Sequence, residues 1–320
     1  MSEVWDINQD VRVIELVGGV DKPVRCFLVK QGDCHVLLDT GYPETAEELL
    51  EAIEGYRIST TLLTHLHLDH SGGASEVKKR KHASVAYHER EYQTLKILLE
   101  AQPWLDKILG PGSHQSFSKF LQYVRSIPEP DVFAYEGMSF GGWRVVHTPG
   151  HTAGHVIVVG GRVGITADLI LENDTTNVAY IPFENYHPLT EFLKNLTKLT
   201  KMNLETIVPS HGPLIRDCRK RAAEIFLHHR QRLAEAAKLL TYRETPALEV
   251  ARDIRWSKGS FDDLSPVDKW LAYLETLSHL DFLAEAGLAV EVSETVYRLS
   301  EGGGWRQVEE QLKRLSENLF

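Results

Sequence analysis

Four side chains that bind metals fall within six consecutive residues of this chain, in the order His65, His67, Asp69 and His70. They follow an apolar run, Thr60–Thr64, that predicts a short strand. Alternate residues of an extended chain project to the same side, so the imidazoles of the first two histidines can hold one cation together. The aspartate and the last histidine lie just beyond and can turn toward a second cation. This spacing predicts a metal site at the end of a strand.

Three more residues of the same type each follow another predicted strand: His151, Asp168 and His211. The complete candidate set has five imidazoles and two carboxylates: His65, His67, Asp69, His70, His151, Asp168 and His211. Seven nitrogen and oxygen donors suit two divalent ions of borderline softness, each with room for water. Zinc is the expected metal, although the same donors would accept iron or manganese. We expect the nearby His155 to support the loop, and Ser71 to cap a helix.

The first 215 residues alternate between apolar strands and helical segments. Short apolar or alternating runs predict nine strands: Val11–Val17, Val24–Lys30, His35–Asp39, Thr60–Thr64, Ser84–Tyr87, Trp143–His147, His155–Val159, Arg162–Thr166 and Thr206–Pro209. Helical spacing predicts helices at Glu44–Glu54 and Leu189–Lys201, and inserted helices within residues 88–126. Sheets flanked by helices indicate an α/β protein of the αββα sandwich type.

The pattern changes after residue 215 and becomes mainly helical. It predicts helices at Arg216–Leu240, Pro246–Ile254 and Pro266–Ala286, a hairpin of Leu288–Val292 with Thr295–Leu299, and one amphipathic helix in the tail. Three helices followed by a hairpin is the order of a winged helix. We therefore divide the chain into a catalytic domain, residues 1–215, and a helical, winged-helix-like domain, residues 216–320.

The charge and the cysteine content indicate in which cellular compartment the protein acts and which partners it can bind. The formal net charge is −10, which disfavours nonspecific binding to nucleic acid or to an anionic membrane. No apolar run approaches the roughly 20 residues that span a bilayer, and the acidic, alternating N-terminus differs from a signal peptide. Three scattered cysteines predict no disulfide framework. We expect a cytoplasmic protein with no membrane partner.

The order of these motifs resembles that of the metallo-β-lactamase superfamily over about residues 10–215, and Leu37–Gly41 resembles a strand end of the same family. The resemblance implies a metallo-β-lactamase sandwich with two metals at one sheet edge. It also implies that His65, His67 and His151 hold the first metal. Asp69, His70 and His211 would then hold the second metal, with Asp168 bridging both. The C-terminal region resembles winged-helix appendages of this superfamily, found among others in lactamase-like endoribonucleases.

The resemblance implies a metal-dependent hydrolase whose nucleophile is a hydroxide shared by the two ions, with Asp69 and Asp168 as the catalytic carboxylates. The favoured substrate is a small thioester, ester or lactone, because the chain is acidic and the inserted helices carry apolar residues for a pocket: Tyr92, Leu95, Trp104, Phe117 and Phe120. The alternative is an endoribonuclease or phosphodiesterase, supported by basic residues after the catalytic domain: Arg216, Arg219, Lys220, Arg221, Arg230 and Arg232. A third hypothesis treats the C-terminal domain as a protein-interaction surface, for instance in a homodimer.

Overall fold

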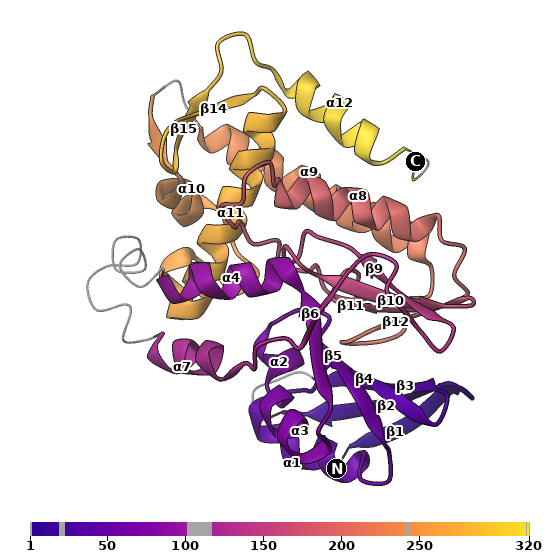
Figure 1. Ribbon diagram of the computed structural model, residues 1–320. Helices are drawn as coiled ribbons and strands as arrows, with labels where there is room; N and C mark the ends of the chain where they lie inside the picture. Colours follow the sequence, from indigo (N-terminus) through magenta and orange to yellow (C-terminus); the bar gives the residue numbers. More distant parts are fainter. Residues whose placement is uncertain (1, 19–22, 101–116, 241–242, 318, 320) are drawn as a thin grey trace.

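Two β-sheets form the centre of the computed structural model, which describes residues 2–18, 23–100, 117–240, 243–317 and 319 (Figure 1). Within these residues the first sheet has the strand order β1-β2-β3-β4-β5-β6-β7. Its strands are β1 (Glu3–Asn8), β2 (Val11–Val17), β3 (Pro23–Gln31), β4 (Cys34–Leu38), β5 (Ile58–Leu62), β6 (Ser84–His88) and β7 (Val132–Ala134). Strands β4 to β7 are mutually parallel, and β1 to β4 are antiparallel.

The second sheet has the order β12-β11-β10-β9-β8. Its strands are β8 (Ser139–Phe140), β9 (Trp143–His147), β10 (Val156–Gly160), β11 (Val163–Ala167) and β12 (Thr206–Pro209). Strand β10 is antiparallel to both β9 and β11, and β12 is parallel to β11. Strands β9, β11 and β12 therefore run in the same direction and end at the same edge of the sheet.

The two sheets pack face to face because their strands are apolar on both sides. In β3, Phe27 and Val29 point into the cluster between the sheets, whereas Cys26 and Leu28 face the helices outside. Val145, Val158 and Val208 complete the inter-sheet cluster from the second sheet. Full burial on both faces explains why these strands read as continuous apolar runs.

Helices cover the outer face of each sheet, which confirms the predicted αββα sandwich (Figure 1). Helix α1 (Ala46–Ala52) and helix α3 (Ala74–Lys81) cover the first sheet. Helix α8 (Pro188–Thr200) and helix α9 (Cys218–Leu239) cover the second. Helix α4 (Glu89–Glu100) and helix α7 (Ser118–Ser126) belong to the inserted segment and pack against each other.

The C-terminal region continues the core that α8 and α9 begin. One apolar cluster runs from Val146 and Ile157 of the second sheet to Leu277 and Tyr297 near the end of the chain. The elements after α9 are β13 (Thr245–Pro246), α10 (Ala247–Asp253), α11 (Pro266–Glu285), β14 (Ala289–Ser293), β15 (Val296–Leu299) and α12 (Trp305–Leu315). Strands β13, β15 and β14 form a small antiparallel sheet in that order.

Most predicted elements lie within two residues of the observed ones, with informative exceptions. The predicted helix Glu44–Glu54 is a 3₁₀ turn, Pro43–Thr45, followed by the shorter α1. Strand β5 ends at Leu62 rather than at Thr64, so the histidines that follow do not leave it directly. Four strands of the described residues were not predicted: β1, β7, β8 and β13. Three of these have only two or three residues, too few to show a period.

Among the described helices, none is long and apolar enough to cross a membrane. All three cysteines lie within the described residues, and none of them forms a disulfide there.

Candidate metal centre

The seven candidate residues meet at the carboxyl ends of four strands. His65 and His67 lie in the loop after β5, and the other ligands of the second sheet follow β9, β11 and β12 in turn. Asp69 and His70 sit on a short helix, α2 (Leu68–Ser71), whose N-cap is His67. Asp69 and His70 therefore turn out of the extended course that His65 and His67 follow, as the sequence analysis expects. The turn of α2 is what directs Asp69 and His70 away from the first two histidines.

Three imidazoles form the first group of this cluster: His65, His67 and His151. The Nε2 atom of His151 lies 3.2 Å from Nε2 of His65 and 3.0 Å from Nδ1 of His67, and the latter two atoms are 3.1 Å apart. His151 donates its Nδ1–H to the backbone carbonyl of Asn177 at 2.7 Å, so its Nε2 carries a lone pair. His65 likewise directs Nδ1 to Thr64 Oγ1. Lone pairs that face one another in this way are arranged for a shared cation.

Asp69, His70 and His211 form the second group. Oδ2 of Asp69 is 3.0 Å from Nε2 of His211 and 3.6 Å from Nε2 of His70. Each imidazole donates its Nδ1–H outward, His70 to Asp39 Oδ2 and His211 to the carbonyl of Pro23, both at 2.8 Å. Both Nε2 atoms are thereby left to face the carboxylate, as metal ligands do when their other nitrogen is held by an outer partner.

Asp168 lies between the two groups. Its Oδ1 is 3.6 Å from His70 Nε2 and 3.7 Å from His211 Nε2, while Oδ2 is 3.9 Å from His151 Nε2. Oδ1 is buried and has no hydrogen-bond partner among the described residues. A buried carboxylate oxygen without a donor is costly unless a cation compensates it. The orphaned oxygen and the facing lone pairs fit divalent ions held by this set of residues.

The electrostatics of the cluster agree with its geometry. Burial lowers the pKa of His67 to about 3, and the adjacent His151 acts in the same direction. Burial would raise the pKa of Asp168, but the imidazoles of His70 and His211 outweigh it and hold that pKa below its usual value. Burial also opposes a charge on His70, yet Asp69 and Asp168 raise the pKa of that imidazole well above its usual value. The carboxylates therefore favour positive charge in their midst.

Asp39 supports the cluster through hydrogen bonds to Thr64 and His70. In the sequence it stands out only as part of a strand end. Its buried carboxylate accepts hydrogen bonds from Thr64 N at 2.7 Å, Thr64 Oγ1 at 2.8 Å and His70 Nδ1. Its backbone has φ of +58°, a left-handed conformation that aspartate and asparagine tolerate better than most residues. The strand-end pattern Asp39-Thr40-Gly41 was the signal that could have assigned it this role.

Glu91 is a second supporting residue, which no motif of the sequence indicates. It is buried at the start of α4, where Oε2 accepts from the amide of Leu66 at 3.0 Å and Oε1 accepts from the amide of Gly154 at 2.8 Å. Leu66 lies between the first two histidines of the motif, and Gly154 belongs to the loop of His151. One carboxylate thus joins the two loops that supply the first group.

The sequence predicts supporting roles for two neighbouring residues, and the structure confirms one of them and not the other. His155 supports the loop as expected, because its Nδ1 lies 2.8 Å from Thr148 Oγ1 and its Nε2 accepts from the amide of Asp168 at 3.3 Å. The prediction that Ser71 caps a helix N-terminus is wrong. It ends α2, and its Oγ donates back to the carbonyl of His67.

The inserted helices contribute to an apolar cavity, but through other residues than those expected, and Tyr92 and Phe120 pack against a core cluster instead. Leu95 and Phe117 are buried in core clusters rather than lining a cavity, and Phe117 packs against Trp270. Trp104 lies outside the described residues. The insertion instead contributes Ile97 and Leu98 to a cavity of about 340 Å³ that it shares with the C-terminal region.

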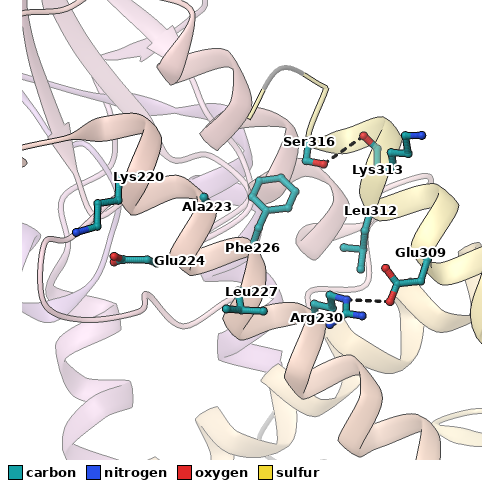
Figure 2. Close-up of a pocket in the computed structure, with 10 residues that line it drawn as sticks. All are labelled: Lys220, Ala223, Glu224, Phe226, Leu227, Arg230, Glu309, Leu312, Lys313 and Ser316. Atoms are coloured by element: carbon teal, nitrogen blue, oxygen red, sulfur yellow. Dashed lines mark hydrogen bonds and ion pairs between the residues drawn. The ribbon is translucent and has the colours of Figure 1, made fainter. Parts of the chain in front are cut away.

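A separate groove of about 550 Å³ lies between α9 and α12 (Figure 2). Phe226 and Leu227 of α9 and Leu312 of α12 form its apolar floor, and Arg230 is paired with Glu309 across it at 2.8 Å. Neither helix carries a residue of the cluster, so this groove is not part of the metal centre.

Comparison with known proteins connects this geometry to a family. A family model described as the metallo-beta-lactamase superfamily matches residues 19–211. The probable metallo-hydrolase YqjP of Bacillus subtilis is 25% identical over 290 residues, which cover 80% of this chain and 86% of the relative. An atrochrysone carboxyl ACP thioesterase of Aspergillus fumigatus is 24% identical over 230 residues, covering 67% of this chain and 60% of the relative.

A solved structure has the same fold over nearly the whole chain. It is a metallo-beta-lactamase family protein of Thermus thermophilus, with a TM-score of 0.74 and 24% identity, and the match covers 92% of this chain and 99% of that one. The shared fold thus includes the C-terminal region described above.

Proposed function

Since the chain belongs to the metallo-beta-lactamase superfamily and is a hydrolase of that fold, we propose that it hydrolyses a small thioester, ester or lactone at the seven-residue cluster. The observation that carries the proposal is the pairing of two ligand groups around one buried carboxylate. Each group offers three donor atoms within 4.8 Å of one another, and Asp168 lies within 4 Å of both.

Two divalent ions, with zinc as the first choice, fit these donors. His65, His67 and His151 would hold one ion, Asp69, His70 and His211 the other, and Asp168 would contact both. When bound, such ions supply a hydroxide near neutral pH and polarise a carbonyl oxygen.

The chain's own carboxylates have different tasks in this proposal. Asp168 is nearly enclosed, with 11% of its side chain exposed, and holds the imidazoles of both groups around it. The side chain of Asp69 is 23% exposed and so faces the space that a substrate enters. We assign the carboxylate of Asp69 to accept the proton released when water attacks the carbonyl carbon. It returns that proton to the sulfur or oxygen that leaves as the acyl bond breaks.

No residue of the cluster lines the 340 Å³ cavity, but Tyr180 of its wall belongs to the same segment as Asn177, whose carbonyl accepts from His151, and we assign this cavity to an apolar substrate group. Its walls come from α4, residues 180–182, α11 and the β14–β15 hairpin: Ile97, Leu98, Tyr180, Ile181, Pro182, Trp270, Leu274, Leu277 and Tyr297, with Glu100, Glu291 and Glu294 also lining it. An aliphatic or aromatic acyl group fits apolar walls, whereas the three carboxylates repel a polyanion. The similarity to a relative named as a thioesterase is a further reason to put thioesters first.

The C-terminal region supports an endoribonuclease less well. Its order α9, β13, α10, α11, β14, β15 is that of a winged helix, and we propose that fold for it. However, α11 is packed against α8, α9, α10 and β14, with Trp270, Leu277 and Leu280 buried, so it is not open to a nucleic-acid groove. Three of the basic residues are paired with neighbouring carboxylates: Arg221 with Glu224, Arg230 with Glu309 and Arg232 with Glu235.

The test is a metal analysis followed by an activity screen on the same purified sample. We expect about two equivalents of zinc and turnover of an acyl thioester, ester or lactone that a chelator abolishes and added zinc restores. Asp69→Ala should lower kcat at least about 100-fold, while His82→Asn, at an exposed histidine away from the cluster, should leave it unchanged. Metal-dependent cleavage of single-stranded RNA without acyl hydrolysis would reverse the ranking, and a metal-loaded protein inactive on the whole panel would contradict the proposal.

A further inference from the structure

An irregular segment, residues 176–180, lies between the metal centre and the C-terminal helix α11. On one side, the carbonyl of Asn177 accepts the Nδ1–H of His151, and Thr176 Oγ1 donates to the backbone carbonyl of Asp168 at 2.8 Å. On the other side, Asn177 Nδ2 donates to Glu275 Oε2 at 2.5 Å, and the amide of Tyr180 donates to the carbonyl of Leu274 at 3.1 Å. The segment therefore touches both the cluster and α11.

The segment has no regular structure to fix its position. It belongs to no helix or strand, so its backbone is held by the contacts on either side of it. A metal-binding imidazole needs a fixed acceptor for its second ring nitrogen, because that bond sets both the tautomer and the orientation of the ring. For His151 this acceptor is a backbone carbonyl of the irregular segment. The contacts that hold Asn177 in place therefore also determine the orientation of the His151 ring.

We propose that Glu275 of α11 is a positioning residue for the first metal group, acting through the side chain of Asn177 on the ring of His151. The proposal rests on the metal centre proposed above. It gives the C-terminal region a definite role in the hydrolase, because a helix of that region supplies the anchor for one ligand loop.

The surroundings of Glu275 fit an anchor. Its own backbone carbonyl accepts the Nδ1–H of His279 one turn later at 2.7 Å, and Nε2 of that imidazole lies 3.2 Å from Nδ1 of His229 on α9. Glu275 is thus part of a hydrogen-bonded row that ties α11 to α9. Because α9 packs on α8, which covers the second sheet, the anchor is fixed to the body of the protein rather than to a free helix.

The chain offers a matched control on the same helix. Glu285 also stands on α11 and also accepts a side-chain hydrogen bond from another element, the hydroxyl of Thr190 on α8. Its second partner is Gln311 of α12, at 2.8 Å. Neither of these partners belongs to the cluster or to the segment that holds His151. Removing the Glu285 carboxylate therefore costs a comparable inter-element bond without reaching His151.

The experiment measures binding of Zn²⁺ and of Co²⁺ to the full chain after metal removal. Glu275→Leu should weaken the first group about 10-fold or more, as loss of an outer partner of a ligand does, and should leave the second group unchanged. Glu275→Gln, which keeps an oxygen acceptor for Asn177, should restore the wild-type affinity, and Glu285→Leu should match wild type. Asn177→Ala cuts the same bond at a partly exposed position and should reproduce the loss, so the test holds even if Glu275→Leu folds poorly.

Amide hydrogen exchange provides a second readout that a merely structural role would not change. Coupling between sites is reciprocal, so Zn²⁺ binding should slow exchange in α11 around Glu275 in the wild type and in Glu275→Gln, and not in Asn177→Ala. Wild-type affinity in both Asn177→Ala and Glu275→Leu would overturn this inference alone. A wild-type chain that takes up no Zn²⁺ would overturn the metal centre, and the inference with it.

Discussion

Glu91 accepts a hydrogen bond from Gly154, with its Oε1 2.8 Å from the amide nitrogen. The other oxygen of the same buried carboxylate holds the amide of Leu66, so a residue of the inserted helix fixes two ligand loops. We expect Glu91→Gln to lower the free energy of unfolding by about 1–3 kcal/mol, because an amide NH₂ would replace one acceptor opposite a buried N–H. Urea unfolding measures this loss, and metal titration should show a weaker first group.

The control for this prediction is Glu89→Gln on the exposed side of the same helix turn, which should change neither quantity. If Glu91→Gln kept both the stability and the metal affinity of the wild type, the two loops would not depend on this carboxylate.

Asp39 gives a prediction for the second metal group. Asp39→Asn keeps a residue that tolerates the left-handed backbone but leaves three donors, from Thr64 and His70, to share one oxygen. We expect the affinity of the group that contains His70 to fall about 10- to 100-fold. A two-step Co²⁺ titration followed by absorption separates the two groups. Equal weakening of both steps would show that Asp39 acts on the general fold and not on His70.

Gly150, beside His151, tests how tightly the ligand loop packs on α8. Its φ is +143°, and a Cβ there would lie 2.4 Å from the Cα of Phe192. Gly150→Ala should therefore destabilise the protein by about 3 kcal/mol or more, because both the backbone conformation and the space exclude a side chain. Gly161→Ala is the matched control, since it has φ of +56° but nothing within 4 Å of its Cβ. It should cost only about 1 kcal/mol. Calorimetric melting of the two variants distinguishes steric exclusion from backbone strain.

The fold, and the convergence of the seven candidate residues, could be predicted from the sequence because both depend on repeated local patterns. Two-sided apolar strands produce continuous runs, and β2, β9 and β12 have the predicted bounds. Ligand-type residues after strands are rare enough to be recognised, and the strand directions bring them to one edge.

The supporting roles of Glu91 and Asn177 could not be predicted from the sequence, for a physical reason. A glutamate such as Glu91 in an amphipathic helix looks like any solvated acidic residue until tertiary packing buries it. Asn177 acts partly through its backbone carbonyl, a group that every residue has. The residue type therefore does not reveal its contact with His151. The short helix α2 was also missed, because four residues hold no helical period.

Glu275 makes the stability of the metal-free protein depend on pH. Burial raises the pKa of its carboxyl group from 4.5 to about 7, against the opposing effects of Arg232 and Asn177. The folded state then holds a proton that the unfolded state releases between pH 4.5 and 7. This contribution to stability is fully present below about pH 4.5 and is lost as pH rises to about 7, by up to about 3 kcal/mol. Glu275→Gln has no proton to lose, so its stability relative to wild type should rise over that range and level off above it.

Urea unfolding in the presence of a chelator, from about pH 5 to about pH 8, measures this difference. The groups that act on Glu275 include Arg232, which opposes the rise of its pKa, and the imidazole of His279 bonds to its backbone carbonyl. Burial lowers the pKa of His229 well below its usual value and that of His279 to about 3. Glu301→Gln, at an exposed site, is the control and should follow the wild-type curve. A constant difference between Glu275→Gln and wild type at all pH values would contradict the assignment.

Removal of metal should destabilise the chain by an amount that depends on free zinc. An ion that binds only the folded state adds RT ln(1 + [L]/Kd), about 2.7 kcal/mol when zinc is about 100 times its dissociation constant. We therefore expect a chelator to lower the melting temperature, zinc to restore it in a concentration-dependent way, and magnesium to fail, since imidazole nitrogens are poor ligands for that ion. In Asp168→Ala the shared carboxylate is lost, so added zinc should raise the melting temperature less than in wild type. A chelator effect of the same size in both proteins would show that the ions responsible bind elsewhere.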